Sequence, residues 1–154
     1  MHYFAYGSNM DWDQMKGRCP SVSSVGVALL PDYRLAFTRR SINRGCGVAD
    51  AVRHAGQNVW GVVYKVSDSD VGRLDASEGF RPGREKNSYW RRECVVLLEG
   101  DDSRLLTVST YFGDPQVDPP LPNQAYKGQI LSGARYWRLP AEYIHRLEGI
   151  EVEG

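Results

Sequence analysis

Two short stretches of the sequence carry residue types that could bind an anion or transfer a proton. The first is Tyr6, Gly7, Ser8 and Asn9, which follow a short apolar strand and precede a helix predicted over 11–18. A glycine turn at such a point can aim several backbone N–H groups at a carboxylate or a developing oxyanion. Gly7 would also let a ligand approach the backbone closely. The alternative is an ordinary turn in which Asn9 caps the helix.

The second stretch ends a helix predicted after Ser67, with Ser67 as its N-cap and Gly79 just beyond its last turn. Val71, Leu74 and Glu78 then share one inward face at spacings of three and four. Desolvation and the negative end of the helix dipole would both raise the pKa of Glu78, which suits general acid–base chemistry. The alternative is a glutamate that reaches solvent or pairs with a nearby arginine. Those arginines are Arg73, Arg81 and Arg84.

Other kinds of site find little support in the sequence. The three histidines are far apart and no metal-ligand motif occurs, so no metal site is predicted. No phosphate-binding loop or dinucleotide-binding glycine motif is present. Arg39, Arg40 and Arg44 form a small basic cluster that either binds an anion or is an ordinary solvated loop.

Length and composition limit the class of protein. The 154 residues suit one domain over 1–154, and 19 basic and 19 acidic residues give a net charge of zero. Zero net charge argues against a dedicated nucleic-acid binder and against polybasic docking to a membrane. Three widely spaced cysteines indicate free thiols, and neither a signal peptide nor a membrane span is predicted. We therefore expect a cytoplasmic monomer or homodimer without nucleic-acid or membrane partners.

Short apolar and alternating runs predict about six or seven strands. These runs cover 3–6, 24–30, 33–37, 47–52, 59–66, 93–98 and 105–112. Further helices are predicted over 124–137 and 140–149, and loops over 81–88 and over the proline-rich segment 114–123, which we expect to form a wall beside a site. The pattern indicates an α+β fold, a small mixed, curled sheet or barrel with flanking helices.

Five segments, in order along nearly the whole chain, resemble the γ-glutamylcyclotransferase-like family. They are Tyr-Phe-Ala-Tyr-Gly-Ser-Asn-Met at 3–10, Val-Trp-Gly-Val-Val-Tyr at 59–64, Leu74-Asp75 with Glu78-Gly79, Tyr89 with 91–96, and a C-terminal segment that includes Tyr126, Gly133-Ala134, Leu139-Pro140, Tyr143 and Leu147. The resemblance implies a small mixed barrel or curled sheet with flanking helices, and an enzyme that needs no cofactor and no metal.

The resemblance also implies a reaction on a small γ-glutamyl substrate. The α-amine of the γ-glutamyl group attacks its own γ-carbonyl, which releases 5-oxoproline and a free amine or amino acid. Because the nucleophile belongs to the substrate, the protein must fold the γ-glutamyl chain and move protons. Glu78 is the expected general acid and base. The 6–9 backbone would bind the α-carboxylate, the oxyanion or both, and Tyr126 would hydrogen-bond the γ-glutamyl group unless it only packs in the core.

The amine that is released differs among members of this family, which act on γ-glutamyl amino acids, lysine-type amines, glutathione or γ-glutamyl caps of antibiotic intermediates. The arginines of the 38–46 and 81–88 loops favour an anionic leaving group. Asp75 would raise the pKa of Glu78 further if the two carboxylates are close. Two other hypotheses are a non-catalytic protein that binds a small ligand on the same fold, and a regulatory protein that acts through the basic surface around Arg39.

Overall fold

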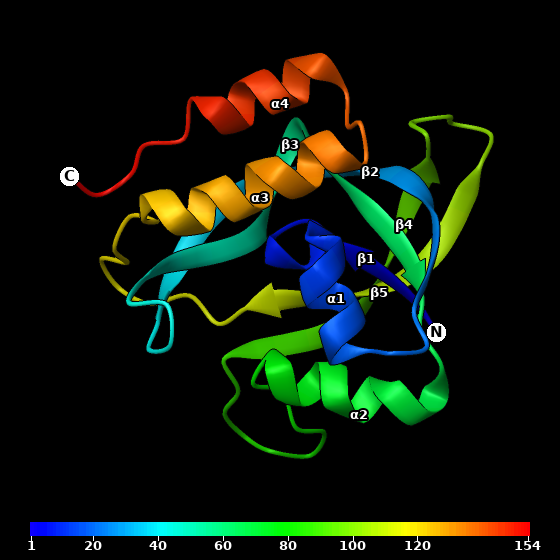
Figure 1. The fold of residues 1–154 in the computed structure, drawn as a ribbon, viewed down its shortest axis with the longest axis horizontal. Helices are drawn as coiled ribbons and strands as arrows, with labels where there is room; N and C mark the ends of the chain where they lie inside the picture. The colour runs from blue at the N-terminus through cyan, green and yellow to red at the C-terminus, as the bar shows by residue number, and fades with distance from the viewer.

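The computed structural model describes residues 1–154, and its centre is a closed five-stranded barrel (Figure 1). The strands are β1 (His2–Ala5), β2 (Ser23–Ser41), β3 (Cys46–Lys65), β4 (Tyr89–Leu98) and β5 (Leu105–Gly113). They follow the order β1-β3-β2-β4-β5, and four antiparallel pairings are closed by a parallel contact between Tyr3 of β1 and Ser109 of β5. The mixed, curled α+β barrel predicted from the sequence is therefore confirmed.

The strand count is lower than predicted because β2 and β3 each join two of the predicted strands. The two form one long hairpin whose register runs from Ser23 opposite Lys65 to Ser41 opposite Cys46. Pro31 and Asp32 lie between the predicted strands 24–30 and 33–37, and their residue types are typical of a turn. The register instead shifts between Pro31 and Tyr33, so these residues produce an irregularity inside β2 and the strand continues.

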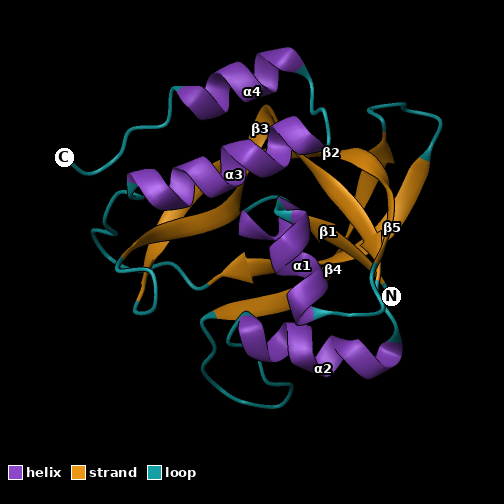
Figure 2. Cartoon of the chain, in the orientation of Figure 1, coloured by secondary structure: helices purple, strands orange, loops and turns teal.

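Helices lie outside the barrel, as Figure 2 shows in purple around the orange strands. They are the 3-10 turn η1 (Ser8–Met10) and the helices α1 (Trp12–Arg18), α2 (Asp68–Ser77), α3 (Gln124–Tyr136) and α4 (Ala141–Glu148). All the predicted helices are confirmed in position. Ser67 is the N-cap of α2 as predicted, but its hydroxyl group bonds to Ser21 and Ser69 and does not cap the helix backbone.

A single apolar cluster of 29 buried residues connects the barrel with the helices that cover it. At one contact α3 packs directly on η1, where a Cβ added to Gly133 would lie 2.6 Å from the carbonyl carbon of Met10. This close approach fixes the turn that follows β1. No helix combines the length and the apolar character that crossing a membrane requires.

Gly61 is a position in β3 where the neighbouring strand β1 leaves no room for a side chain. A Cβ there would lie 2.2 Å from the carbonyl oxygen of Ala5 in β1. We predict that Gly61→Ala lowers the free energy of unfolding by about 1–3 kcal/mol or more, because backbone must move to admit the methyl group. Urea denaturation measures the change. Gly26→Ala is the matched control, since no atom lies within 4 Å of its added Cβ; equal midpoints for the two variants would contradict the prediction.

Candidate active site

All six residues singled out for binding or catalysis line one cavity of about 330 Å³, here called the inner chamber. Its lining consists of Tyr3, Tyr6, Gly7, Ser8, Asn9, Ala49, Glu78, Tyr89, Thr110, Tyr111 and Tyr126. These residues come from both ends of the chain and from its middle, and the closure of the barrel brings them together. The six residues that the sequence analysis selected therefore lie together, although Tyr6 and Tyr126 are more than 100 positions apart in the chain.

The 6–9 loop lines this chamber and has backbone N–H groups without a hydrogen-bond partner. No turn, cap or side-chain hydrogen bond uses the N–H groups of Gly7, Ser8 or Asn9 as donors. A Cβ at Gly7 would lie 3.3 Å from the Cβ of Ala49, so a side chain there would crowd the chamber wall. Three consecutive free N–H groups can bind a carboxylate or an oxyanion, as predicted. Asn9 is not a helix cap, because Asp11 caps α1 through the N–H groups of the next turn.

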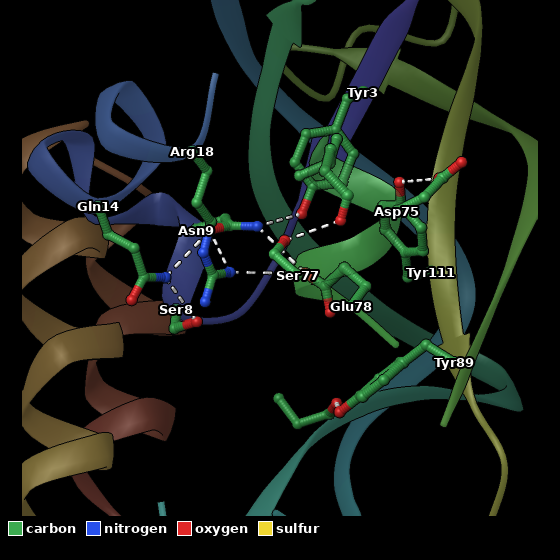
Figure 3. A network of polar contacts seen from close by, with 12 residues as sticks. Tyr3, Ser8, Asn9, Gln14, Arg18, Asp75, Ser77, Glu78, Tyr89 and Tyr111 are labelled. Carbon is green, nitrogen blue, oxygen red and sulfur yellow. Dashed lines mark hydrogen bonds and ion pairs between the residues drawn. The ribbon is translucent and has the colours of Figure 1, made fainter. Parts of the chain in front are cut away.

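The side-chain amide of Asn9 uses all of its hydrogen-bonding positions, and the residue is only 2% exposed (Figure 3). Its Oδ1 accepts from Gln14 Nε2 at 3.0 Å and from Arg18 Nη1 at 2.9 Å. Its Nδ2 donates to the hydroxyl group of Tyr3 at 3.0 Å and to Oε1 of Glu78 at 3.1 Å. Because two donors from α1 fix the carbonyl, the amide NH₂ can only face Glu78 and Tyr3.

Glu78 ends α2, and its side chain is 18% exposed at the chamber. Gly79 follows with a φ of +68°, which turns the chain away as a residue after a helix end commonly does. Burial raises the pKa of Glu78, whereas the positive charges of Arg18 and Arg44 lower it. The predicted desolvation is confirmed. The alternative, a pairing with Arg73, Arg81 or Arg84, is not found: the cation that pairs with Glu78 is Arg18 of α1, at 3.9 Å from Oε1.

Asp75 does not act on Glu78 in the way we predicted. Its carboxylate accepts from Arg91 Nη1 at 2.6 Å and from the hydroxyl group of Tyr111 at 2.6 Å. It is therefore paired within the barrel wall, and it holds Tyr111 in place at the edge of the chamber. Burial, and not this neighbouring carboxylate, is what raises the pKa of Glu78.

The sequence did not single out Tyr3, Tyr89 and Tyr111 as site residues, yet all three line the chamber. Burial raises the pKa of every chamber tyrosine, so these side chains stay protonated. The Tyr126 oxygen accepts the N–H of Ala49 at 2.9 Å, which leaves its O–H hydrogen free to donate. Glu78 is therefore the one carboxylate in a chamber otherwise lined by neutral donors and acceptors.

The chamber opens into a larger cleft of about 1240 Å³, here called the arginine cleft. Ser8, Glu78, Tyr89 and Tyr126 line both spaces. Four arginines line the cleft in addition; they are Arg18, Arg39, Arg40 and Arg44. The predicted basic cluster of the 38–46 loop therefore lies beside the chamber.

Two other predictions about this region are wrong. Arg84 and Arg81 do not line the cleft, because the Arg84 guanidinium folds back onto the carbonyl oxygen of Gly79 at 3.0 Å. The proline-rich 114–123 segment does not form its wall either. This segment lies behind the β2–β3 hairpin, where Leu121 accepts the N–H of Gly47 at 2.9 Å, so it supports the wall from outside.

Comparisons with known proteins agree with this geometry. A family model described as "Gamma-glutamyl cyclotransferase, AIG2-like" matches residues 3–138. Proteins named Gamma-glutamylcyclotransferase from Homo sapiens and Bos taurus are 33% and 34% identical, over 97% of this chain and 78% of each relative. A solved structure named "Gamma-glutamyl cyclotransferase" is 31% identical and has a TM-score of 0.89, over 99% of this chain and 88% of that one. The chain therefore belongs to the γ-glutamyl cyclotransferase, AIG2-like family, which confirms the predicted family.

Arg18 should control the proton affinity of Glu78. Its positive charge opposes the effect of burial, so Arg18→Gln should raise the pKa of Glu78, while Gln still offers an N–H to Asn9. Carboxyl-carbon NMR titration measures this pKa, with the Glu78→Gln spectrum assigning the signal. Lys16→Gln, a charge loss on the exposed face of the same helix, is the control. An unchanged or lower pKa in Arg18→Gln would exclude this role.

Proposed function

We propose that this protein is a γ-glutamylcyclotransferase in which Glu78 moves the protons. The observation that carries the proposal is the position of Glu78, a partly buried carboxylate of raised pKa, in one small chamber with the free N–H groups of the 6–9 loop. Membership of the family and the names of its relatives support the reaction class. The residues and their roles below are part of the proposal.

Ionised Glu78 first accepts a proton from the α-ammonium group of the substrate. The resulting amine attacks the γ-carbonyl carbon, a C–N bond closes the five-membered ring, and negative charge develops on the carbonyl oxygen. Protonated Glu78 then donates to the leaving nitrogen as the original amide C–N bond breaks. The ring nitrogen still carries a second proton, which the ionised Glu78 accepts and passes to the released amine. The products are 5-oxoproline and a free amine in its ammonium form, and Glu78 is again ionised. One carboxylate serves first as base and then as acid. Its pKa must therefore be low enough for the ionised form to be present and high enough for the carboxylate to accept a proton.

The rest of the chamber supplies position and hydrogen bonds. Three backbone N–H groups and the Tyr126 O–H are enough donors for both the substrate α-carboxylate and the oxyanion. Asn9 holds Glu78 through its Nδ2, which limits the carboxylate to one direction. The chamber, at most about 330 Å³ with its open mouth included, favours a folded γ-glutamyl chain, and folding brings the amine and the carbonyl together.

The proposal treats residues 1–154 as one catalytic unit that acts on a small molecule without metal or cofactor. A reducing, cytoplasmic location agrees with three cysteines that form no disulfide. Zero net charge agrees with the absence of a nucleic-acid partner. A monomer and a homodimer both fit a chamber that is complete within one chain.

Glu78→Gln should abolish turnover and keep the fold. Loss of proton transfer should lower the release of 5-oxoproline from γ-glutamyl-alanine by at least about 100-fold. The amide retains an oxygen for the N–H of Asn9. Its Tm at pH 7 should not fall, because a carboxyl group of raised pKa costs stability in full above that raised pKa and stops doing so only below its ordinary value. Glu151→Gln, on the exposed C-terminal segment, is the control. Turnover that survives in Glu78→Gln would exclude the proposed role; ligand binding without turnover in the native protein would favour the binding-protein hypothesis.

The pH dependence of kcat/KM should reflect the same carboxyl group. Activity needs ionised Glu78, so the rate should rise with pH along an acid limb whose midpoint lies above the ordinary glutamate value of 4.5. Arg18→Gln should move this limb to still higher pH, because it removes the cation that favours the ionised form. Steady-state rates from pH 4 to 9 would measure both midpoints. A limb at or below the ordinary glutamate value would assign the base to another group.

A further inference from the structure

The arginine cleft has a strong excess of positive charge that ring closure itself does not require. Its lining contains four arginines and one carboxylate, Glu78, in a chain with equal numbers of basic and acidic residues. Three of these arginines, Arg39, Arg40 and Arg44, belong to none of the ion pairs of the protein. Their charges are therefore available to a ligand.

Arg44 is held in place without being neutralised. Its Nη1 donates to Oε1 of Gln129 at 2.8 Å, and its Nη2 donates to Oε1 of Gln14 at 3.0 Å. Its guanidinium also lies over the ring of Tyr126, at 4.8 Å from the ring centre. Two neutral amides and an aromatic ring hold the Arg44 guanidinium in place. Carboxylates in these positions would have cancelled its charge. Because Tyr126 lines both spaces, Arg44 lies at the boundary between chamber and cleft.

The guanidinium groups of Arg39 and Arg40 are also held by neutral partners. The Nη1 of Arg39 donates to the backbone carbonyl of Asp114 at 2.7 Å, and the Nη1 of Arg40 donates to that of Gly45 at 3.3 Å. These neutral acceptors use a small part of the five N–H donors on each guanidinium. Three cations at three places along one cleft exceed what a single α-carboxylate requires.

The leaving group must extend from the chamber into this cleft. The scissile nitrogen has to reach Glu78, which lines both spaces. With the γ-glutamyl part in the chamber, as in the proposed function, the cleft is the space that remains for the leaving group. We propose that the cleft selects an acidic amino acid as the leaving group, so that the preferred substrates are γ-glutamyl-glutamate and γ-glutamyl-aspartate. One arginine binds the α-carboxylate and another binds the side-chain carboxylate. This inference rests on the proposed function, because it assumes that a γ-glutamyl amide is cleaved at Glu78.

The test compares substrates that differ by one charge. The kcat/KM for γ-glutamyl-glutamate should exceed that for γ-glutamyl-glutamine by about tenfold or more, the effect of one charge-assisted hydrogen bond. Added NaCl should reduce this ratio, because salt screens the attraction. Of Arg39→Gln and Arg40→Gln, the variant that removes the partner of the side-chain carboxylate should bring the ratio toward one, whereas loss of an α-carboxylate partner should lower both kcat/KM values alike. Arg34→Gln, an exposed charge loss on the same strand outside the cleft, should leave it unchanged.

The outcomes separate this inference from the proposed function. No 5-oxoproline from any substrate, including γ-glutamyl-alanine, would count against the proposed function itself. Turnover of γ-glutamyl-glutamine at the same or higher efficiency than γ-glutamyl-glutamate would overturn the charge selection and leave the reaction in place. A preference that persists in both Arg39→Gln and Arg40→Gln would also overturn it, because the cleft would then not be its source.

Discussion

The side-chain amide of Asn9 is the interaction on which the geometry of the site depends. It accepts from α1, donates to β1 through Tyr3, and donates to the end of α2 through Glu78. Each of its donor and acceptor positions is occupied, so the buried amide has only one orientation that satisfies it. The amide thereby links α1, β1 and the end of α2, and these contacts set the direction of the Glu78 carboxylate.

The electrostatics of the chamber combine two opposing effects on the same carboxylate. Burial favours the protonated form of Glu78, and the cations of Arg18 and Arg44 favour the ionised form. A carboxyl group whose pKa is raised by burial alone would be ionised too rarely to act as a base. One whose pKa is lowered by the arginines alone would be protonated too rarely to act as an acid. The opposition suits a residue that has to act in both ways. Both arginines also line the cleft, so proton affinity and ligand charge are coupled at this boundary.

The sequence was informative where a local pattern carries its own chemistry. A glycine turn after a strand and a glutamate in the last turn of a helix can be recognised without knowing the fold, and family resemblance strengthened the assignment of both. Tyr3, Tyr111 and Arg18 could not be found in this way, because they reach the site only when the barrel closes and α1 packs across η1. The division of β2 and β3 into shorter strands failed for a related reason, since Pro31 and Asp32 break the register of the hairpin without ending it.

That long hairpin explains how one fold can serve different leaving groups. Most residues of the chamber lie on the closed barrel and in the turn at η1, and Glu78 and Tyr126 reach it from the end of α2 and from α3. Most of these side chains belong to or contact the buried core, which leaves little freedom to change them. Three arginines of the cleft, Arg39, Arg40 and Arg44, lie near the tip of the β2–β3 hairpin, beside exposed positions such as Ile42, which is 94% exposed. The proline-rich segment holds this tip from behind through backbone contacts at Thr38 and Gly47. Because those contacts do not depend on side chains at the tip, substitutions there can alter the charge offered to the leaving group while the ring-closing chamber keeps its shape.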